Sequence, residues 1–150
     1  MEYAIGIDAG THTGIAIYNV KKSKFSVIKS LPLHLAHIMI LDFNNTHKGN
    51  FYVIVEDARQ RKWFGKESDS KLQGAGSIKR DCRFWDEVLN YHKMPHLFVH
   101  PINGGTKLKS DYFKKITGYT ERTNEHGRDA AMLVFGRKSI NKIVLKYGIK

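Results

Sequence analysis

Two carboxylates, Asp8 and Glu56, each stand at the end of an apolar segment that has the pattern of a buried strand. If the two strands lie parallel and side by side, their end residues come within about 5 Å of each other. Carboxylates at that distance repel, and the pair is costly unless one is protonated or a cation lies between them. Hard oxygen ligands favour Mg²⁺ or Mn²⁺, so the pattern indicates a metal site; the alternative is that each acid caps a turn.

A histidine and a third acid lie close together in the segment EHGRDAA. His126 and Asp129 stand three residues apart at the start of a helical pattern, so one turn would present both side chains to one site. Alternatively, Asp129 only stabilises the first turn of the helix through its negative charge, and His126 is a solvated surface histidine. Three carboxylates and an imidazole are the donor set of a two-metal site, in which one ion activates water and the second stabilises the leaving 3′ oxygen of a phosphodiester.

The segment GIDAGTHTGIAI, residues 6–17, has a second interpretation as a phosphate-binding turn of the kind found in sugar kinases and actin-like ATPases. That interpretation needs a second phosphate loop and a second domain of similar size. A chain of 150 residues leaves no room for either and is expected to form one domain. Asp8 is therefore expected to bind metal, with Gly10 and Gly14 permitting a tight reversal whose tip, 11–13, is exposed.

The spacing of apolar residues and turn formers predicts an α/β chain. In chain order we expect strands at 3–7, 13–18 and 25–29, a helix at 32–43, a strand at 51–56, a helix at 72–92, a strand at 96–102, and helices at 108–116 and 125–148. An antiparallel meander joined to two parallel strands through crossover helices gives a mixed five-stranded sheet flanked by helices. This is the order of the ribonuclease-H-like fold.

The charge balance predicts a polyanionic partner. Lys and Arg number 25 against 14 Asp and Glu, a surplus of eleven positive charges, and nucleic acid is the commonest partner of such a chain. A basic protein without such a partner is the alternative. In RQRKWFGK, cations could hold phosphates while a ring stacks on an unpaired base, or the rings could pack the loop onto the core. The candidate nucleic-acid contacts are Arg59, Arg61, Lys62, Trp63, Phe64, Lys107 and Lys109.

Cysteine usage and hydropathy predict the compartment. Cys82 is the single cysteine, which excludes an intrachain disulfide and a Cys-rich zinc site and fits a reducing cytosol. The most apolar later stretch, LPLHLAHIMIL, is short and interrupted by His34 and His37. We therefore expect neither a signal peptide nor a membrane span.

Four segments resemble the RuvC family of Holliday-junction resolvases, within the ribonuclease-H-like superfamily: GIDAGTHTGIAI, VIVEDA, KLQGAGSIKR and NEHGRDAAMLVFG. In order and spacing they cover nearly the whole chain. The resemblance implies a single nuclease domain, residues 1–150, acting as a homodimeric, Mg²⁺-dependent endonuclease that nicks four-way DNA junctions symmetrically. Asp8, Glu56 and Asp129 match the family's acidic residues, and His126 matches a position that holds Asp or His among its members.

The chain also departs from the family pattern. It is shorter than a typical cellular member, which indicates a phage or otherwise divergent version, and Arg59 stands where cellular resolvases place a phenylalanine. Two other functions stay open: a less selective nuclease acting on branched DNA or RNA–DNA hybrid, and a non-catalytic nucleic-acid-binding domain, against which the intact carboxylates argue. In a dimer the middle helix is the interface candidate, although core burial explains its apolar residues equally well: Phe84, Trp85, Val88 and Leu89.

Overall fold

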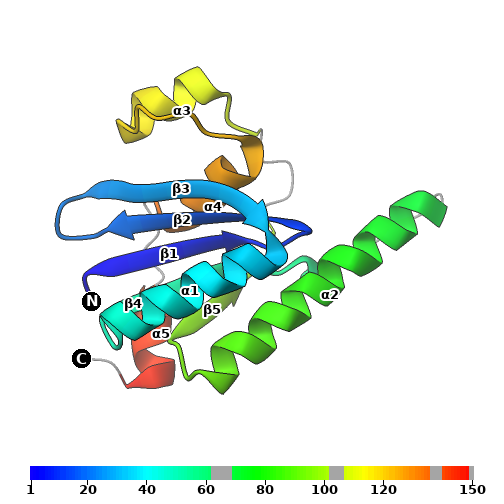
Figure 1. Ribbon diagram of the computed structural model, residues 1–150, viewed down its shortest axis with the longest axis horizontal. Helices are drawn as coiled ribbons and strands as arrows, with labels where there is room; N and C mark the ends of the chain where they lie inside the picture. The colour runs from blue at the N-terminus through cyan, green and yellow to red at the C-terminus, as the bar shows by residue number, and fades with distance from the viewer. Residues whose placement is uncertain (62–68, 102–106, 136–139, 149–150) are drawn as a thin grey trace.

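A mixed five-stranded sheet forms the centre of the molecule (Figure 1). The structure, a computed structural model, describes residues 1–61, 69–101, 107–135 and 140–148. The strands are β1 (Tyr3–Asp8), β2 (His12–Asn19), β3 (Lys24–Pro32), β4 (Phe51–Glu56) and β5 (His96–Val99), in the spatial order β3-β2-β1-β4-β5. The first three strands are antiparallel neighbours, whereas β4 is parallel to both β1 and β5. The predicted α/β fold with an antiparallel meander and two parallel strands is confirmed.

The helices cover both faces of this sheet. They are α1 (Leu33–His47), the short 3₁₀ helix η1 (Ala58–Gln60), α2 (Asp69–Tyr91), α3 (Ser110–Thr117), α4 (Glu125–Val134) and α5 (Ile140–Tyr147). Side chains of α1 and α2 pack on one face, and side chains of α3, α4 and α5 pack on the other. Because β1 and β4 are covered on both faces, their sequences are continuous apolar runs. None of the helices in the described ranges is both long and apolar enough to cross a membrane.

The parallel pairing of β1 and β4 brings the two predicted carboxylates together. Ile7 of β1 lies opposite Val55 of β4 in the ladder. The next residues along the two strands are Asp8 and Glu56, which end them side by side. The sheet therefore places both acids at the same edge.

All the helices differ somewhat from their predicted bounds, and α1 continues to His47, past the predicted end at Phe43. The expected helix at 125–148 ends at Val134, because Phe135 leaves the helical conformation (φ −70°, ψ 116°) and its ring lies against Tyr18 and Phe25 at centroid distances of 6.2 and 6.0 Å. The next helix, α5, begins at Ile140. Helix α2 begins at Asp69, three residues before the predicted start, and its first turns extend past the sheet in Figure 1.

Helix α4 lies unusually close to β1 and β2 because two glycines face it. A Cβ atom on Gly6 would collide with the carbonyl oxygen of Ala130, and one on Gly14 with the carbonyl oxygen of His126. Gly14 lies opposite Asp8 in the β1–β2 ladder. The beginning of α4, which carries His126, therefore lies directly over the end of β1.

The role predicted for Gly14 is therefore wrong in part. Gly14 lies within β2, which already begins at His12, and it makes room for α4 rather than for the chain reversal. Thr13, which was expected at an exposed tip, is buried, and its hydroxyl donates to the carbonyl oxygen of Gly10 at 2.8 Å. Thr11 and His12 are exposed as expected.

This close packing can be tested at Gly14. We expect Gly14→Ala to lower the melting temperature by about 6 to 12 °C. A collision with backbone atoms places the cost of overpacking at about 3 kcal/mol, and each kcal/mol shifts Tm by about 2–4 °C at this size. Gly10→Ala is the matched control, since a Cβ there would lie 3.4 Å from the carbonyl oxygen of His12, an ordinary contact. Equal melting temperatures for the two variants would contradict the proposed packing constraint.

Candidate active site

All four predicted metal-binding or catalytic side chains line one pocket at the edge of the sheet. The pocket encloses about 390 Å³ and is lined by Asp8, Glu56, His126 and Asp129. The first two come from the ends of β1 and β4, and the other two from the first turns of α4. Two cationic side chains, Arg61 and Lys107, line the same pocket. Elements distant in sequence thus converge on one concave surface that combines acids, an imidazole and cations.

The environment of Asp8 raises the pKa of its carboxyl group. Its side chain is only 19% exposed, and Nδ1 of His126 lies 3.0 Å from its Oδ2. Burial raises the pKa of Asp8, the hydrogen bond from His126 lowers it, and the negative charges of Glu56 and Asp129 raise it again, with a net value of about 6. The charged form of Asp8 is therefore disfavoured chiefly by burial and further by the two neighbouring acids.

Glu56 has a different partner within the pocket. Its Oε1 accepts a hydrogen bond from Nη2 of Arg61 at 3.2 Å, and the two side chains form an ion pair that is partly open to solvent. Arg61 follows η1, the 3₁₀ turn that comes directly after β4. Arg61 therefore pairs with Glu56 although the two lie only five positions apart in sequence, because the turn brings the chain back to the end of β4.

The start of α4 is held in place by a cap and by an arginine. The Asn124 side chain accepts a hydrogen bond from the N–H of Gly127 at 2.9 Å, which satisfies one of the free donors of the first turn. Arg128 donates from Nε to the carbonyl oxygen of Leu108 at 2.8 Å and from Nη1 to that of Thr123 at 3.0 Å. The contact with Leu108 joins the start of α4 to the segment that begins at Lys107, and the other two stabilise the first turn itself.

The Lys107 side chain reaches the pocket from that segment. It forms an ion pair with Glu125, the first residue of α4. The sequence predicted Lys107, but it did not predict the cap at Asn124 or the contact of Arg128 that joins α4 to this segment. Asn124 carried a usable signal, because Asn is a favoured residue directly before a helix. Arg128 carried none, because its acceptor at Leu108 lies 20 residues away.

The predicted nucleic-acid contacts are found in different environments. Arg61 and Lys107 line the pocket, whereas Lys109 is exposed directly before α3. Lys62, Trp63 and Phe64 lie outside the described residues.

Arg59 points into the protein rather than into the pocket. Its guanidinium pairs with Asp57 at 2.7 Å and with Asp86 at 2.8 Å, and it lies 4.7 Å from the ring centre of Phe98. The hydrogen bonds that the guanidinium donates to both carboxylates raise the pKa of Arg59 further. This geometry ties η1 to α2 and β5 and favours a structural role for Arg59, while its predicted contact with nucleic acid stays a prediction.

The donor set of the pocket suits a hard divalent cation. Within the described ranges, no three His, Cys, Asp or Glu side chains are arranged to hold a metal ion as they stand. Asp8 is instead paired with His126, and Glu56 with Arg61. Carboxylate oxygens are the ligands that Mg²⁺ and Mn²⁺ prefer, and the excess negative charge around Asp8 is what such an ion would neutralise. Binding of the ion would compete with these two internal pairs.

The sheet order and the helices on both faces define an α/β protein with the ribonuclease-H-like fold. A solved structure of T. thermophilus RuvC in complex with a Holliday junction substrate matches it with a TM-score of 0.58 and 15% sequence identity, over 99% of this chain and 98% of that one. A second structure of Thermus thermophilus RuvC matches with a TM-score of 0.54 and 15% identity, over 98% of this chain and 97% of that one. No family model and no curated protein matches the chain. The chain therefore has a RuvC-like fold.

Because the pKa of Asp8 is raised in the folded protein, the stability of the fold should depend on pH. Because the folded-state pKa of about 6 exceeds the ordinary value of 3.8, the stability that this carboxyl contributes is complete below pH 3.8 and is lost as the pH rises through 6. At pH 7.5 with a chelator, Asp8→Asn should therefore raise the free energy of unfolding by about 3 kcal/mol and Tm by several degrees. Thermal unfolding followed by circular dichroism measures this.

The gain should shrink as the pH falls from 6 towards 4, where the wild-type carboxyl becomes protonated. Glu87→Gln is the matched control, because Glu87 is an exposed acid on α2 outside the pocket. It should leave Tm nearly unchanged at every pH. A lower Tm for Asp8→Asn than for wild type at pH 7.5 would show that Asp8 is a stabilising structural acid.

Proposed function

We propose that this chain is a metal-dependent, structure-selective endonuclease that cleaves phosphodiester bonds at four-way DNA junctions. The observation that carries the proposal is the convergence of Asp8, Glu56, Asp129 and His126 on one pocket of a RuvC-like fold. Residues 1–150 would form one nuclease domain. Symmetric nicking of a junction requires two active sites, so the proposed active form is a homodimer.

The proposed roles of the residues follow from their chemistry. Asp8, Glu56 and Asp129 hold Mg²⁺, or Mn²⁺ in its place, through carboxylate oxygens. Bound there, divalent ions supply an activated water and stabilise the leaving 3′ oxygen. His126 orients the Asp8 carboxylate through the hydrogen bond at 3.0 Å, and its imidazole suits Mn²⁺ coordination or proton acceptance. The acids thus contribute position and negative charge.

The cations of the pocket are assigned to the substrate. Arg61 and Lys107 line the same pocket as the carboxylates, so their charges lie where a phosphodiester would reach the metal ions. The chain carries a surplus of eleven positive charges, which favours binding of a polyanion. The RuvC structure that this fold resembles was determined in complex with a Holliday junction, which supports branched DNA as the substrate.

One observation favours a second candidate function, a less selective nuclease acting on branched DNA or RNA–DNA hybrid. Arg59 occupies the position at which the RuvC resemblance would place a phenylalanine, and its guanidinium is held by Asp57 and Asp86. A ring that could enter a junction is therefore absent at that position. Both candidates share the metal chemistry and differ only in substrate preference.

Cleavage assays with Mg²⁺ on a mobile four-way junction, a flap and an RNA–DNA hybrid test this proposal. Asp8→Asn, Glu56→Gln and Asp129→Asn should each lower the rate at least about a hundredfold, because each removes a charged ligand from the transition state. Binding of the junction in Ca²⁺ should persist. Asp111→Asn, at an exposed acid of α3 outside the pocket, is the matched control and should cut normally.

The outcomes separate the candidates. Faster cleavage of the junction than of the flap and hybrid supports the resolvase, while equal rates favour the less selective nuclease. Near wild-type cleavage by any one of the three acid variants would remove that residue from the proposed site. No metal-dependent cleavage of any substrate by the wild-type chain would overturn the proposed function.

A further inference from the structure

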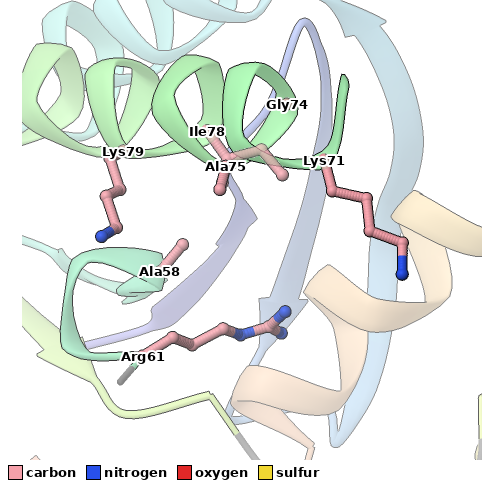
Figure 2. Close-up of a pocket in the computed structure, with 7 residues that line it drawn as sticks. All are labelled: Ala58, Arg61, Lys71, Gly74, Ala75, Ile78 and Lys79. Carbon is pink, nitrogen blue, oxygen red and sulfur yellow. The ribbon is translucent and has the colours of Figure 1, made fainter. Parts of the chain in front are cut away.

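A second hollow adjoins the candidate active site and differs from it in chemistry. It encloses about 340 Å³ between α2 and the turn around η1 (Figure 2), and we call it the α2 groove. Ala58, Arg61 and Ile78 line both this groove and the carboxylate pocket. The two hollows are therefore contiguous, with Arg61 at the boundary between them.

The groove combines an apolar floor with a cationic rim. Its floor consists of Ala58, Gly74, Ala75 and Ile78, and its rim of Arg61, Lys71 and Lys79. Figure 2 shows Lys71 and Lys79 leaving α2 on the side that faces Arg61, with Ala75 and Ile78 between them. No acid is among the described residues that line it. Such a surface is complementary to a ligand that carries both an apolar part and negative charge.

The glycine at the floor of this groove is not explained by packing. Glycine is a poor helix former, yet Gly74 and Gly76 both lie inside α2. A Cβ atom at either position would meet nothing within 4 Å in the described part of the chain. Only Gly74 of the two lines the groove. A side chain at 74 would therefore fill space in the groove, whereas one at 76 would not.

The size of the groove limits what can occupy it. About 340 Å³ is at the lower end of the range for small-molecule sites, which suits one nucleotide unit and excludes a base pair. Arg61 is 44% exposed and uses Nη2 for Glu56, which leaves further guanidinium donors for a phosphate. Lys79 lies on the opposite side of the floor and supplies a second cation.

We propose that the α2 groove holds one unpaired nucleotide of the DNA strand that is cut, with its base and sugar on the floor and its phosphates against Arg61 and Lys79. The proposal rests on the proposed nuclease function, because it places this nucleotide next to the phosphate that enters the carboxylate pocket. A continuous duplex has no unpaired nucleotide to offer. The groove would therefore favour substrates whose strands are already separated beside the cut, as they are at a branch point.

The binding test uses thymidine 3′,5′-bisphosphate as the probe and the full chain in a chelator, so that neither metal nor cleavage is involved. Amide signals in ¹H–¹⁵N NMR spectra should shift saturably around Gly74, Ala75 and Ile78. Gly74→Leu, which fills the groove, should weaken binding at least tenfold. Gly76→Leu is the matched control on the same helix and should bind as wild type does.

Two further probes separate a nucleotide site from a simple anion site. Thymidine and inorganic phosphate should each bind at least tenfold more weakly than the bisphosphate. Inorganic phosphate binding as tightly as the bisphosphate would overturn the assignment to a nucleotide. Amide shifts confined to other surfaces, or equal binding of the bisphosphate by Gly74→Leu and wild type, would contradict the proposal that the α2 groove is the binding site.

A cleavage test connects the groove to the proposed function. Lys79→Gln should lower cleavage of a duplex with unpaired nucleotides beside the cut site more than tenfold, while Arg83→Gln, one turn further along α2 and outside the groove, should leave it unchanged. Equal effects of the two variants would contradict the role of the groove in cleavage. A chain that binds the probe but cuts no DNA would contradict the proposed function instead.

Discussion

The close packing of α4 on the first two strands is the constraint on which the candidate site depends. Gly6 and Gly14 remove the side chains that would otherwise hold this helix away from the sheet. Because Gly14 lies opposite Asp8 in the ladder, the helix begins directly over the end of β1. The parallel pairing of β1 and β4 independently brings Glu56 to the same edge. Two close backbone contacts and one strand pairing thus assemble side chains from three distant parts of the chain.

The electrostatics of the pocket follow from that assembly. Three acids meet at a place where Asp8 is largely removed from water, and this raises the pKa of Asp8 to about 6. His126 and Arg61 offset part of the repulsion, each by pairing with one carboxylate. The protein therefore holds a local excess of negative charge that costs stability at neutral pH. Such a cost is expected at a site whose function is to bind a cation.

The strands and their terminal acids were predictable because a buried strand leaves a local signal. Tyr3–Asp8 and Phe51–Glu56 are apolar runs that end in a carboxylate, and this pattern is visible without any tertiary contact. The end of α4 was not predictable, because the helical spacing continues through Phe135 and only its contacts with Tyr18 and Phe25 explain the break.

Other features depended on contacts between residues far apart in sequence. Gly14 was assigned to the turn because a glycine near a reversal signals a turn more often than a close approach of a helix. The contact between Arg59 and Asp86 was not predictable either, because the two residues lie 27 positions apart. The α2 groove likewise forms only where η1 and α2 come together in the fold, so no sequence pattern predicts it.

The central claim is that the edge of the sheet binds a divalent cation between Asp8, Glu56 and Asp129. Titration of the chelator-treated chain with Mn²⁺, followed by paramagnetic broadening of amide signals in NMR spectra, tests it most directly, because the effect falls steeply with distance from the ion. The account predicts that the amides of Ala9, Gly10 and Gly127 broaden first, and that this broadening is lost in Glu56→Gln. Broadening centred on another part of the molecule, or unchanged broadening in that variant, would contradict the account.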